Sequence, residues 1–220
     1  MKKTNGNRLI SNSGLFKPAL ASEALILAGG GHSHALLVRR WAMQPQRRPN
    51  RPITLVSSHG NALYSGMVPA LIAGLTTPEQ ASINLRWLAQ EAQVEFVQAT
   101  IADLKPEGHL GLHERPGMPF GILSINVGAI TPRQHYKNAI AIKPLGPALK
   151  AIEAQDPYGH DTHATPFHCV GAGLAAIEIS LALRERWPQR PLILHTGGRP
   201  IQACMRGELA RAHIQLSNKP

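Results

Sequence analysis

The chain has 220 residues, 43% of them hydrophobic and 16% charged, which is enough for one large or two small soluble domains with a proper core. Its formal net charge is +10, but the basic residues are scattered, with small concentrations only at Arg39-Arg40 and around Arg47-Arg48. Scattered positive charge is typical of a solvated surface, so we expect no nucleic-acid partner.

The cysteines and the N-terminal segment exclude further classes of site and of targeting signal. Cys169 and Cys204 are far apart in the sequence, which excludes a redox-active CxxC pair and a cysteine-based metal site and fits a cytoplasmic location. Residues 1–22 contain no uninterrupted apolar stretch, so we expect a disordered leader rather than a signal peptide. No run reaches the roughly 20 apolar residues that a transmembrane helix needs.

A short apolar run followed by three glycines is the most informative stretch of the chain. Residues 25–28 predict a buried parallel strand, Gly29, Gly30 and Gly31 follow it, and apolar residues at helical spacing come next. Gly29 permits a tight turn, Gly31 lets the backbone approach a pyrophosphate, and the N–H groups and dipole of the helix start favour the phosphates. His34 replaces the third glycine of this dinucleotide-binding pattern, so the first copy is incomplete.

The same pattern returns about 140 residues later. Residues 167–170 predict a strand, followed by Gly171, Gly173 and a helix over 174–187. Two copies predict an α/β fold with two Rossmann-like FAD/NAD(P)-binding βαβ units, built in three layers and accompanied by a small β meander.

Apolar periodicity and turn residues predict the remaining elements. In chain order these are a strand over 53–56, a loop with a short helix over 62–74, a helix over 83–92, a strand over 94–97, the meander over 99–118, a strand over 120–129, a helix from 147 to 153, a polar turn over 155–166, a strand over 190–195, a helical turn over 207–212 and a strand start over 214–216. The strand over 94–97 should join the far side of the first sheet. Gly128 should let the chain turn back close to a bound cofactor.

In both units the second strand is followed by polar residues, at the position where a dinucleotide site usually has an acidic residue for the adenosine ribose. In the first unit these are Ser57 and Ser58, whose hydroxyl groups lack charge assistance, so we expect weak adenosine binding. In the second unit the turn contains Arg199 and no carboxylate. Arg199 is either a surface residue of a glycine turn or the partner of a ribose 2′-phosphate.

Several other candidates have two interpretations each. Residues 62–74 are either a packed connection or a flap beside a cofactor ring. His32 and His34 lie two residues apart at a helix start, and without a nearby cysteine or carboxylate we expect donors to phosphate or backbone and no metal site. Glu178 is either a solvated helix residue or a residue beside the second nucleotide site.

Five segments occur in an order that resembles a known family. They are Gly29-Gly-Gly-His-Ser-His-Ala35, Tyr64-Ser-Gly-Met-Val-Pro69, Leu123-Ser-Ile-Asn-Val-Gly128, Lys143-Pro144 and Gly171-Ala-Gly-Leu-Ala-Ala-Ile-Glu178. The pattern is similar to the FAD-dependent pyridine nucleotide (disulfide) oxidoreductase module that is fused ahead of selenide, water dikinase in some bacteria. That module is related to type II NADH dehydrogenases, and the resemblance covers roughly residues 24–216.

After the expected leader over 1–22, the resemblance implies the first part of an FAD-binding domain over 23–140 and an incomplete NAD(P)-binding domain over 141–220. By matching motifs, the residues along the FAD pyrophosphate are Gly29, Gly30, Gly31 and His34. Those near the isoalloxazine are Tyr64, Ser65 and Gly66, with Gly128 at the return of the chain. Those of the NAD(P)H site are Gly171, Gly173, Ala176 and Glu178. From their positions alone we add His32, Ser57 and Arg199 as cofactor-binding candidates.

The sequence therefore predicts a flavin- and NAD(P)H-dependent oxidoreductase module that passes hydride from nicotinamide to FAD and on to an unidentified small-molecule acceptor. Relatives of this kind continue beyond the second unit and supply a Gly-Asp segment for the ribityl chain, so we expect a truncated module. The alternatives are a non-catalytic nucleotide-binding remnant, or a fragment completed by a second polypeptide that supplies the C-terminal half. A single-Rossmann reductase is disfavoured by the second glycine pattern.

Overall fold

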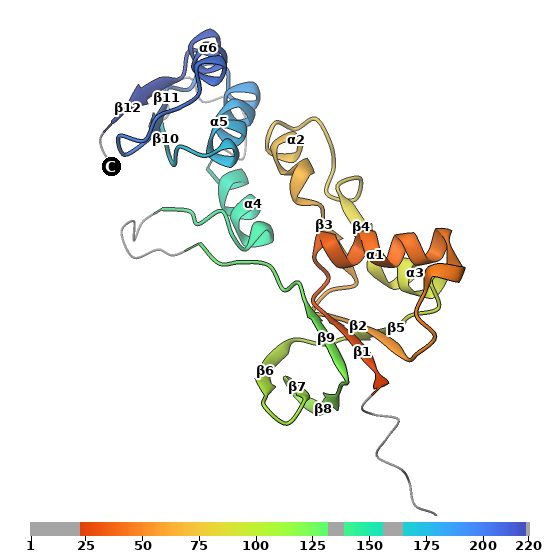
Figure 1. The fold of residues 1–220 in the computed structure, drawn as a ribbon. Coiled ribbons are helices and arrows are strands. Elements are labelled where there is room, and N and C mark those ends of the chain that lie inside the picture. The colour runs from red at the N-terminus through yellow and green to blue at the C-terminus, as the bar shows by residue number, and fades with distance from the viewer. Residues whose placement is uncertain (1–22, 132–138, 156–164, 219–220) are drawn as a thin grey trace, which may run out of the picture.

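The computed structural model describes residues 23–131, 139–155 and 165–218, and it contains two separate parallel sheets (Figure 1). The strands are β1 Leu25–Ala28, β2 Ile53–Ser57, β3 Asn61–Leu63, β4 Ser82–Asn84, β5 Glu95–Gln98, β6 Ile101–Lys105, β7 His109–Leu112, β8 Arg115–Pro119, β9 Ile122–Ile125, β10 Phe167–Val170, β11 Leu192–His195 and β12 Gln215–Ser217. The helices are α1 His32–Met43, α2 Val68–Ile72, α3 Leu85–Glu91, α4 Leu145–Glu153, α5 Leu174–Arg186 and α6 Ala203–Arg211, with short 3₁₀ turns η2 Pro45–Arg47 and η3 Ser65–Met67. The predicted α/β class is confirmed.

The first unit has three layers, and the alternation of side chains along its strands explains them. Its sheet has the parallel order β5-β2-β1-β9. Leu27 and Leu55 face α1 and α3, where they pack with Val38. Ile26 and Val56 point to the other face and pack against the antiparallel sheet β6-β7-β8. A parallel sheet needs cover on both faces, and here helices supply one cover and the predicted meander the other.

The second unit is built on the three-stranded parallel sheet β10-β11-β12. Leu192 and Leu194 of β11 are buried against α5 and α6, where they meet Ile177 and Leu209. The first strands of the two units, β1 and β10, lie in different sheets and have the predicted bounds. Figure 1 shows the second sheet with α5 and α6 at the opposite end of the molecule from the meander.

Helix α2 connects the two units through its apolar residues. Val68 and Ile72 belong to the hydrophobic cluster that also contains Ile177 of α5 and Ile152 of α4. Figure 1 shows α2 beside α5, which agrees with their contacts. The interpretation of residues 62–74 as a packed connection therefore fits α2. Residues 64–66, which precede α2, are exposed.

Several predicted elements have different bounds in the structure. The helix predicted over 83–92 begins only at Leu85, because Ile83 and Asn84 pair with β3 and the Asn84 side chain accepts the Trp87 N–H at 2.9 Å as an N-cap. The strand predicted over 120–129 is limited to β9, and the helical turn predicted over 207–212 is part of the longer α6.

Smaller differences also occur in the second unit, where the strand predicted over 190–195 begins at Leu192 and the helix predicted over 174–187 ends at Arg186. The predicted leader over 1–22 and most of the polar turn over 155–166 lie outside the described residues. Within the part of the chain that the structure describes, no helix is long and apolar enough to cross a membrane.

Candidate functional site

The two glycine turns are constructed in the same way. Gly29 follows β1 with φ +100° and donates its N–H to the Val56 carbonyl oxygen at 2.7 Å. Gly171 follows β10 with φ +144° and donates its N–H to the His195 carbonyl oxygen at 2.9 Å. Both φ values lie in the region that favours glycine. Each turn therefore lies at the carboxyl end of its sheet and leads into a helix, which is where the pyrophosphate lies in dinucleotide-binding folds.

In the first turn, protein atoms fill the space that side chains of Gly30 and Gly31 would need. A Cβ at Gly30 would overlap the Leu85 side chain, and a Cβ at Gly31 would overlap the Asn126 side-chain oxygen. The Gly31 N–H also donates to the Asn126 carbonyl oxygen at 3.2 Å. The packing of the protein itself thus requires glycine at these two positions, whatever ligand the turn holds.

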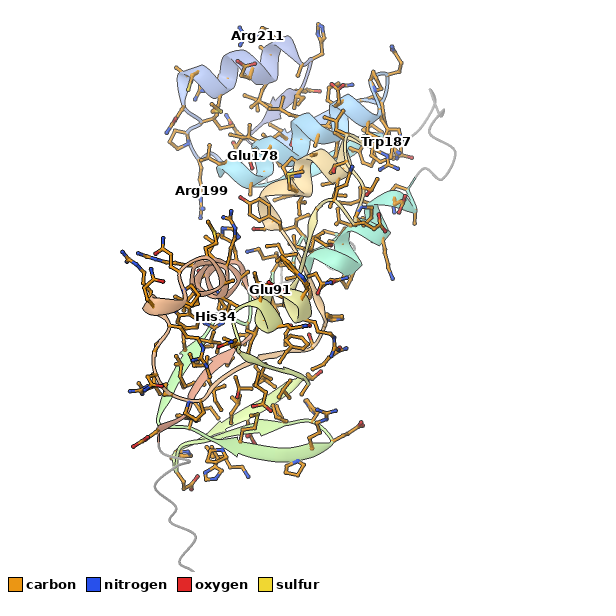
Figure 2. All side chains as sticks on the ribbon, turned by 90° about the vertical axis from the view of Figure 1, so that its right-hand side faces the viewer. His34, Glu91, Glu178, Trp187, Arg199 and Arg211 are labelled. Carbon is orange, nitrogen blue, oxygen red and sulfur yellow. The ribbon has the colours of Figure 1, made fainter. Side chains whose placement is uncertain are left out.

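His34 is 3% exposed and joins α1 to both the turn and β9. Its Nδ1 lies 2.7 Å from the Gly29 carbonyl oxygen, which can only accept, so Nδ1 carries the proton. Nε2 then accepts from the Ser124 hydroxyl at 2.8 Å. Burial lowers the pKa of His34 and favours this neutral form. Figure 2 shows His34 between α1 and the sheet, so the side chain positions the turn and has no nitrogen left for a phosphate.

The structure brings His32 and Tyr64 together although 32 residues separate them in sequence. Their rings stack with centroids 4.8 Å apart and planes 20° from parallel. The Tyr64 ring also lies over Gly66, where a Cβ would be 2.9 Å from the Tyr64 Cζ. His32, Tyr64, Ser65 and Gly66 are all exposed, so they form a small accessible surface at the start of α1.

The second turn is open where the first is filled. Gly173 has φ −84°, and apart from its chain neighbours no atom of the described residues lies within 4 Å of the position a Cβ would take. Neither backbone conformation nor packing requires glycine there. Gly171 differs, because a Cβ on it would lie 2.9 Å from the Ala176 Cβ. The absence of a side chain at Gly173 leaves room in front of α5 for a ligand to approach the backbone.

The remaining predicted residues lie around these turns. Ser57 ends β2, is buried beside Gly30, and accepts the His59 N–H at 3.4 Å. Gly128 has φ +88°, which fits a turn of the chain after β9. Glu178 is exposed on α5, and this position agrees both with a solvated helix residue and with a residue beside the second nucleotide site.

Arg199 is exposed in the turn after β11, where its N–H donates to the Thr196 carbonyl oxygen at 3.2 Å. Gly197 and Gly198 precede it with φ +59° and +75°. Figure 2 shows the Arg199 side chain extending from the second unit toward the first unit.

Ser124 and Asn126 belong to the segment 123–128 that the resemblance includes, but the sequence alone predicts no role for them. The Asn126 N–H donates to the Ala28 carbonyl oxygen at 2.7 Å, and its own carbonyl accepts from Gly31. Together with the Ser124–His34 contact, this fixes the end of β9 against the turn. The available signal was two polar residues alternating in the apolar run of residues 122–127. No group of three or more histidine, cysteine or acidic side chains suited to a metal occurs among the described residues.

No protein-family model and no curated protein sequence matches the chain. Several solved structures, in contrast, match the chain. The sulfide:quinone oxidoreductase of Aquifex aeolicus is 18% identical with a TM-score of 0.65, and the match covers 89% of this chain and 51% of that one. The NADH:rubredoxin oxidoreductase of Clostridium acetobutylicum is 16% identical with a TM-score of 0.65, covering 90% and 53%. The NAD-dependent persulfide reductase of A. fulgidus is 13% identical with a TM-score of 0.69, covering 88% and 39%.

At these identities the likeness concerns the fold, and the chain spans about half the length of the structures it matches. None of the three is the module fused to selenide, water dikinase, so that resemblance stays a prediction. The chain has the Rossmann-like α/β fold that these oxidoreductases share.

Proposed function

We propose that the chain is the two-nucleotide part of an FAD- and NAD(P)H-dependent oxidoreductase. The observation that carries this proposal is the repetition of one turn construction, in which Gly29 bonds to Val56 and Gly171 bonds to His195. A protein that binds one dinucleotide needs one such turn, whereas passing hydride from a nicotinamide to a flavin needs two nucleotides. The fold shared with oxidoreductases supports the proposal.

The residues of the first turn suit the FAD pyrophosphate. Helix α1 begins after Gly31 and has no acidic side chain in its first turn, so its N–H groups and dipole favour a phosphate. His34 holds the Gly29 carbonyl inward, and the stacked rings of His32 and Tyr64 offer an aromatic surface for the isoalloxazine. When bound, FAD would supply the hydride acceptor.

The residues of the second turn suit NAD(P)H. Helix α5 also has no acidic residue in its first turn, and Gly173 leaves the approach to its N-terminus open. Gly171 and Ala176 keep the helix close to the turn. We assign the nicotinamide nucleotide to this turn, with Glu178 and Arg199 beside it. A cytoplasmic location is part of this proposal.

Substitution of Gly173 by alanine tests the proposal. Because the φ of Gly173 is negative and its surroundings are open, Gly173→Ala should leave the free energy of unfolding nearly unchanged. It should weaken NAD(P)H binding at least about tenfold, because the added methyl group obstructs the pyrophosphate. Gly207→Ala in α6, also in open space, is the matched control and should bind like the unmutated chain. Equal NAD(P)H affinity in all three proteins, or no binding to any, would contradict the proposal.

A second candidate is a module that works only when a further polypeptide completes it. The favouring observation is the edge of β9, which pairs with β1 on one side. Because the N–H groups of Ile122 and Asn126 donate to the carbonyl oxygens of Ala24 and Ala28, the backbone groups of Leu123 and Ile125 point to the opposite edge. Within the described residues no strand pairs there, and a strand from a second polypeptide fits that edge.

A further inference from the structure

Residues 24–78 contain five arginines and no aspartate or glutamate. Three of these arginines, Arg39, Arg40 and Arg47, lie on α1 and η2 with exposed side chains. None of the three forms an ion pair with any residue that the structure describes. The positive charge on this side of the first unit is therefore not neutralised within the fold.

Exposed apolar side chains lie between these charges. Helix α1 buries His34, Ala35, Val38 and Trp41, so the helical period places Leu36 and Met43 on its opposite face. These two side chains are 48% and 66% exposed, and they are seven residues apart with Arg39 and Arg40 between them.

The neighbouring helix extends this surface. Helix α3 packs beside α1 on the same face of the sheet (Figure 1). It buries Leu85, Leu88 and Ala89 and leaves Trp87 58% exposed on its outer face. We call the set of these exposed residues the arginine–tryptophan surface, and its members are Leu36, Arg39, Arg40, Met43, Arg47 and Trp87.

The composition of this surface is that of a protein interface. Arginine, methionine and tryptophan are enriched at the centre of interfaces, whereas lysine, aspartate and glutamate are depleted. One acidic side chain, Glu91, lies on α3 (Figure 2), and Glu95 of β5 accepts a hydrogen bond from Thr54 at 2.9 Å. The net field over α1 and η2 stays positive, so the complementary partner is acidic.

We propose that the arginine–tryptophan surface docks a small acidic electron-carrier protein. The proposal rests on the proposed function and names the class of its electron acceptor. His32, which stacks on Tyr64 beside the assigned flavin site, is the first residue of α1, so the surface continues directly from that site along the helix. The reaction balances as NAD(P)H plus two oxidised one-electron carriers giving NAD(P)⁺, one proton and two reduced carriers.

A membrane surface fits the observations less well. A helix that lies on a membrane inserts a continuous apolar face, but the apolar face of α1 is packed into the core. On α1, two apolar side chains flanked by arginines remain outside, and α3 adds the single exposed ring of Trp87. A protein face with acidic groups around an apolar centre matches this arrangement.

The test is a titration of the purified chain with an oxidised plant-type [2Fe–2S] ferredoxin by calorimetry, with rubredoxin as a second acidic carrier. Binding should be strong at about 0.01 M salt and largely lost at about 0.15 M, where the Debye length falls from ~30 Å to ~8 Å. Arg39→Glu with Arg40→Glu should weaken binding roughly tenfold or more, and Arg39→Gln with Arg40→Gln less strongly. Trp87→Ala should weaken it as well.

The matched control is Lys105→Glu with Arg115→Glu, which changes the net charge equally on the exposed meander across the sheet. This variant should bind the carriers within about threefold of the unmutated chain. Three results would each overturn the proposal. The two double variants could weaken binding equally, or neither carrier could bind at low salt. The third is arginine-dependent binding that is tighter to phosphatidylserine vesicles or to duplex DNA than to the carriers. The calorimetric signal does not need bound nucleotide. A failure of carrier docking is therefore distinguishable from a failure of NAD(P)H binding, on which the proposed function depends.

Discussion

His34 and Ala176 occupy the same position in the two glycine patterns, and each contacts the first glycine of its own turn. His34 donates from Nδ1 to the Gly29 carbonyl oxygen at 2.7 Å, whereas the Ala176 methyl group would lie 2.9 Å from a Cβ on Gly171. The second unit thus keeps helix and turn together by close packing. The first unit replaces that packing with a buried imidazole that also bonds to Ser124.

Removing this imidazole should destabilise the first unit. His34→Ala leaves the Gly29 carbonyl and the Ser124 hydroxyl without their partner and opens a cavity, so the free energy of unfolding should fall by roughly 2–4 kcal/mol. Urea unfolding monitored by circular dichroism measures the change. His32→Ala, which removes an exposed ring, is the control and should cost less than about 1 kcal/mol. Similar losses in the two variants would show that the His34 bonds contribute little.

The same imidazole should make stability depend on pH. Burial lowers the pKa of His34 below its ordinary value of 6.5, so the unfolded chain binds this proton more readily than the folded one. Stability from His34 is therefore fully present above pH 6.5 and is lost as the pH falls through the lower pKa of the folded state. Unfolding free energies between about pH 5 and pH 8 should show this loss, and it should be smaller in His34→Gln. An unchanged pH profile in that variant would assign the loss to other groups.

The sequence predicted both parallel units because their strands are local apolar runs that end at glycine turns. It misplaced the start of α3, since Ile83 fits a helical period equally well, and only the N-cap preference of Asn84 separates the two outcomes. The expected role of His34 as a donor to backbone is confirmed by its bond to the Gly29 carbonyl oxygen. Its contact with Ser124 was not predictable, because Ser124 lies 90 residues away and meets His34 only when β9 pairs with β1. The packing of α2 against the second unit depends on the same kind of distant contact.

The first nucleotide site should hold FAD weakly. Ser57 is buried against Gly30, and Ser58 is exposed with its hydroxyl 2.8 Å from His59 Nδ1, so neither offers a carboxylate to the ribose. Ser58→Glu should raise FAD affinity about ten- to hundredfold, because a hydrogen bond to a charged group contributes roughly 1.5–3 kcal/mol. FAD fluorescence titration measures this, and Asn50→Glu is the control for added charge. An unmutated chain that keeps stoichiometric FAD through dialysis would contradict the expectation.

The free edge of β9 should promote association between chains. Ile125 is 58% exposed there, and unpaired backbone groups on an apolar edge are a template for another strand. Ile125→Lys should reduce concentration-dependent association, measured by size exclusion with light scattering. Ile130→Lys changes a side chain that is 80% exposed but lies outside the strand, and it should associate like the unmutated chain. If the unmutated chain is monomeric at every concentration, this edge does not pair with a second chain.

The second nucleotide site should prefer NADP(H) to NAD(H). The turn after β11 presents an exposed Arg199 and no carboxylate, and its guanidinium extends toward the first unit (Figure 2). A forked, charge-assisted contact to the 2′-phosphate should favour NADPH by about ten- to hundredfold, which corresponds to roughly 1.5–3 kcal/mol. Arg199→Ala should remove this difference without changing NADH binding.

Arg211 supplies the matched control, because it pairs with Glu208 on α6 and lies at the far end of the second unit from Arg199 (Figure 2). Arg211→Ala should keep the full preference, since its charge is already neutralised and distant from the turn. Nucleotide fluorescence titrations of the three proteins at one ionic strength make the comparison. Equal affinity of the unmutated chain for NADPH and NADH would leave Arg199 as a surface residue of a glycine turn.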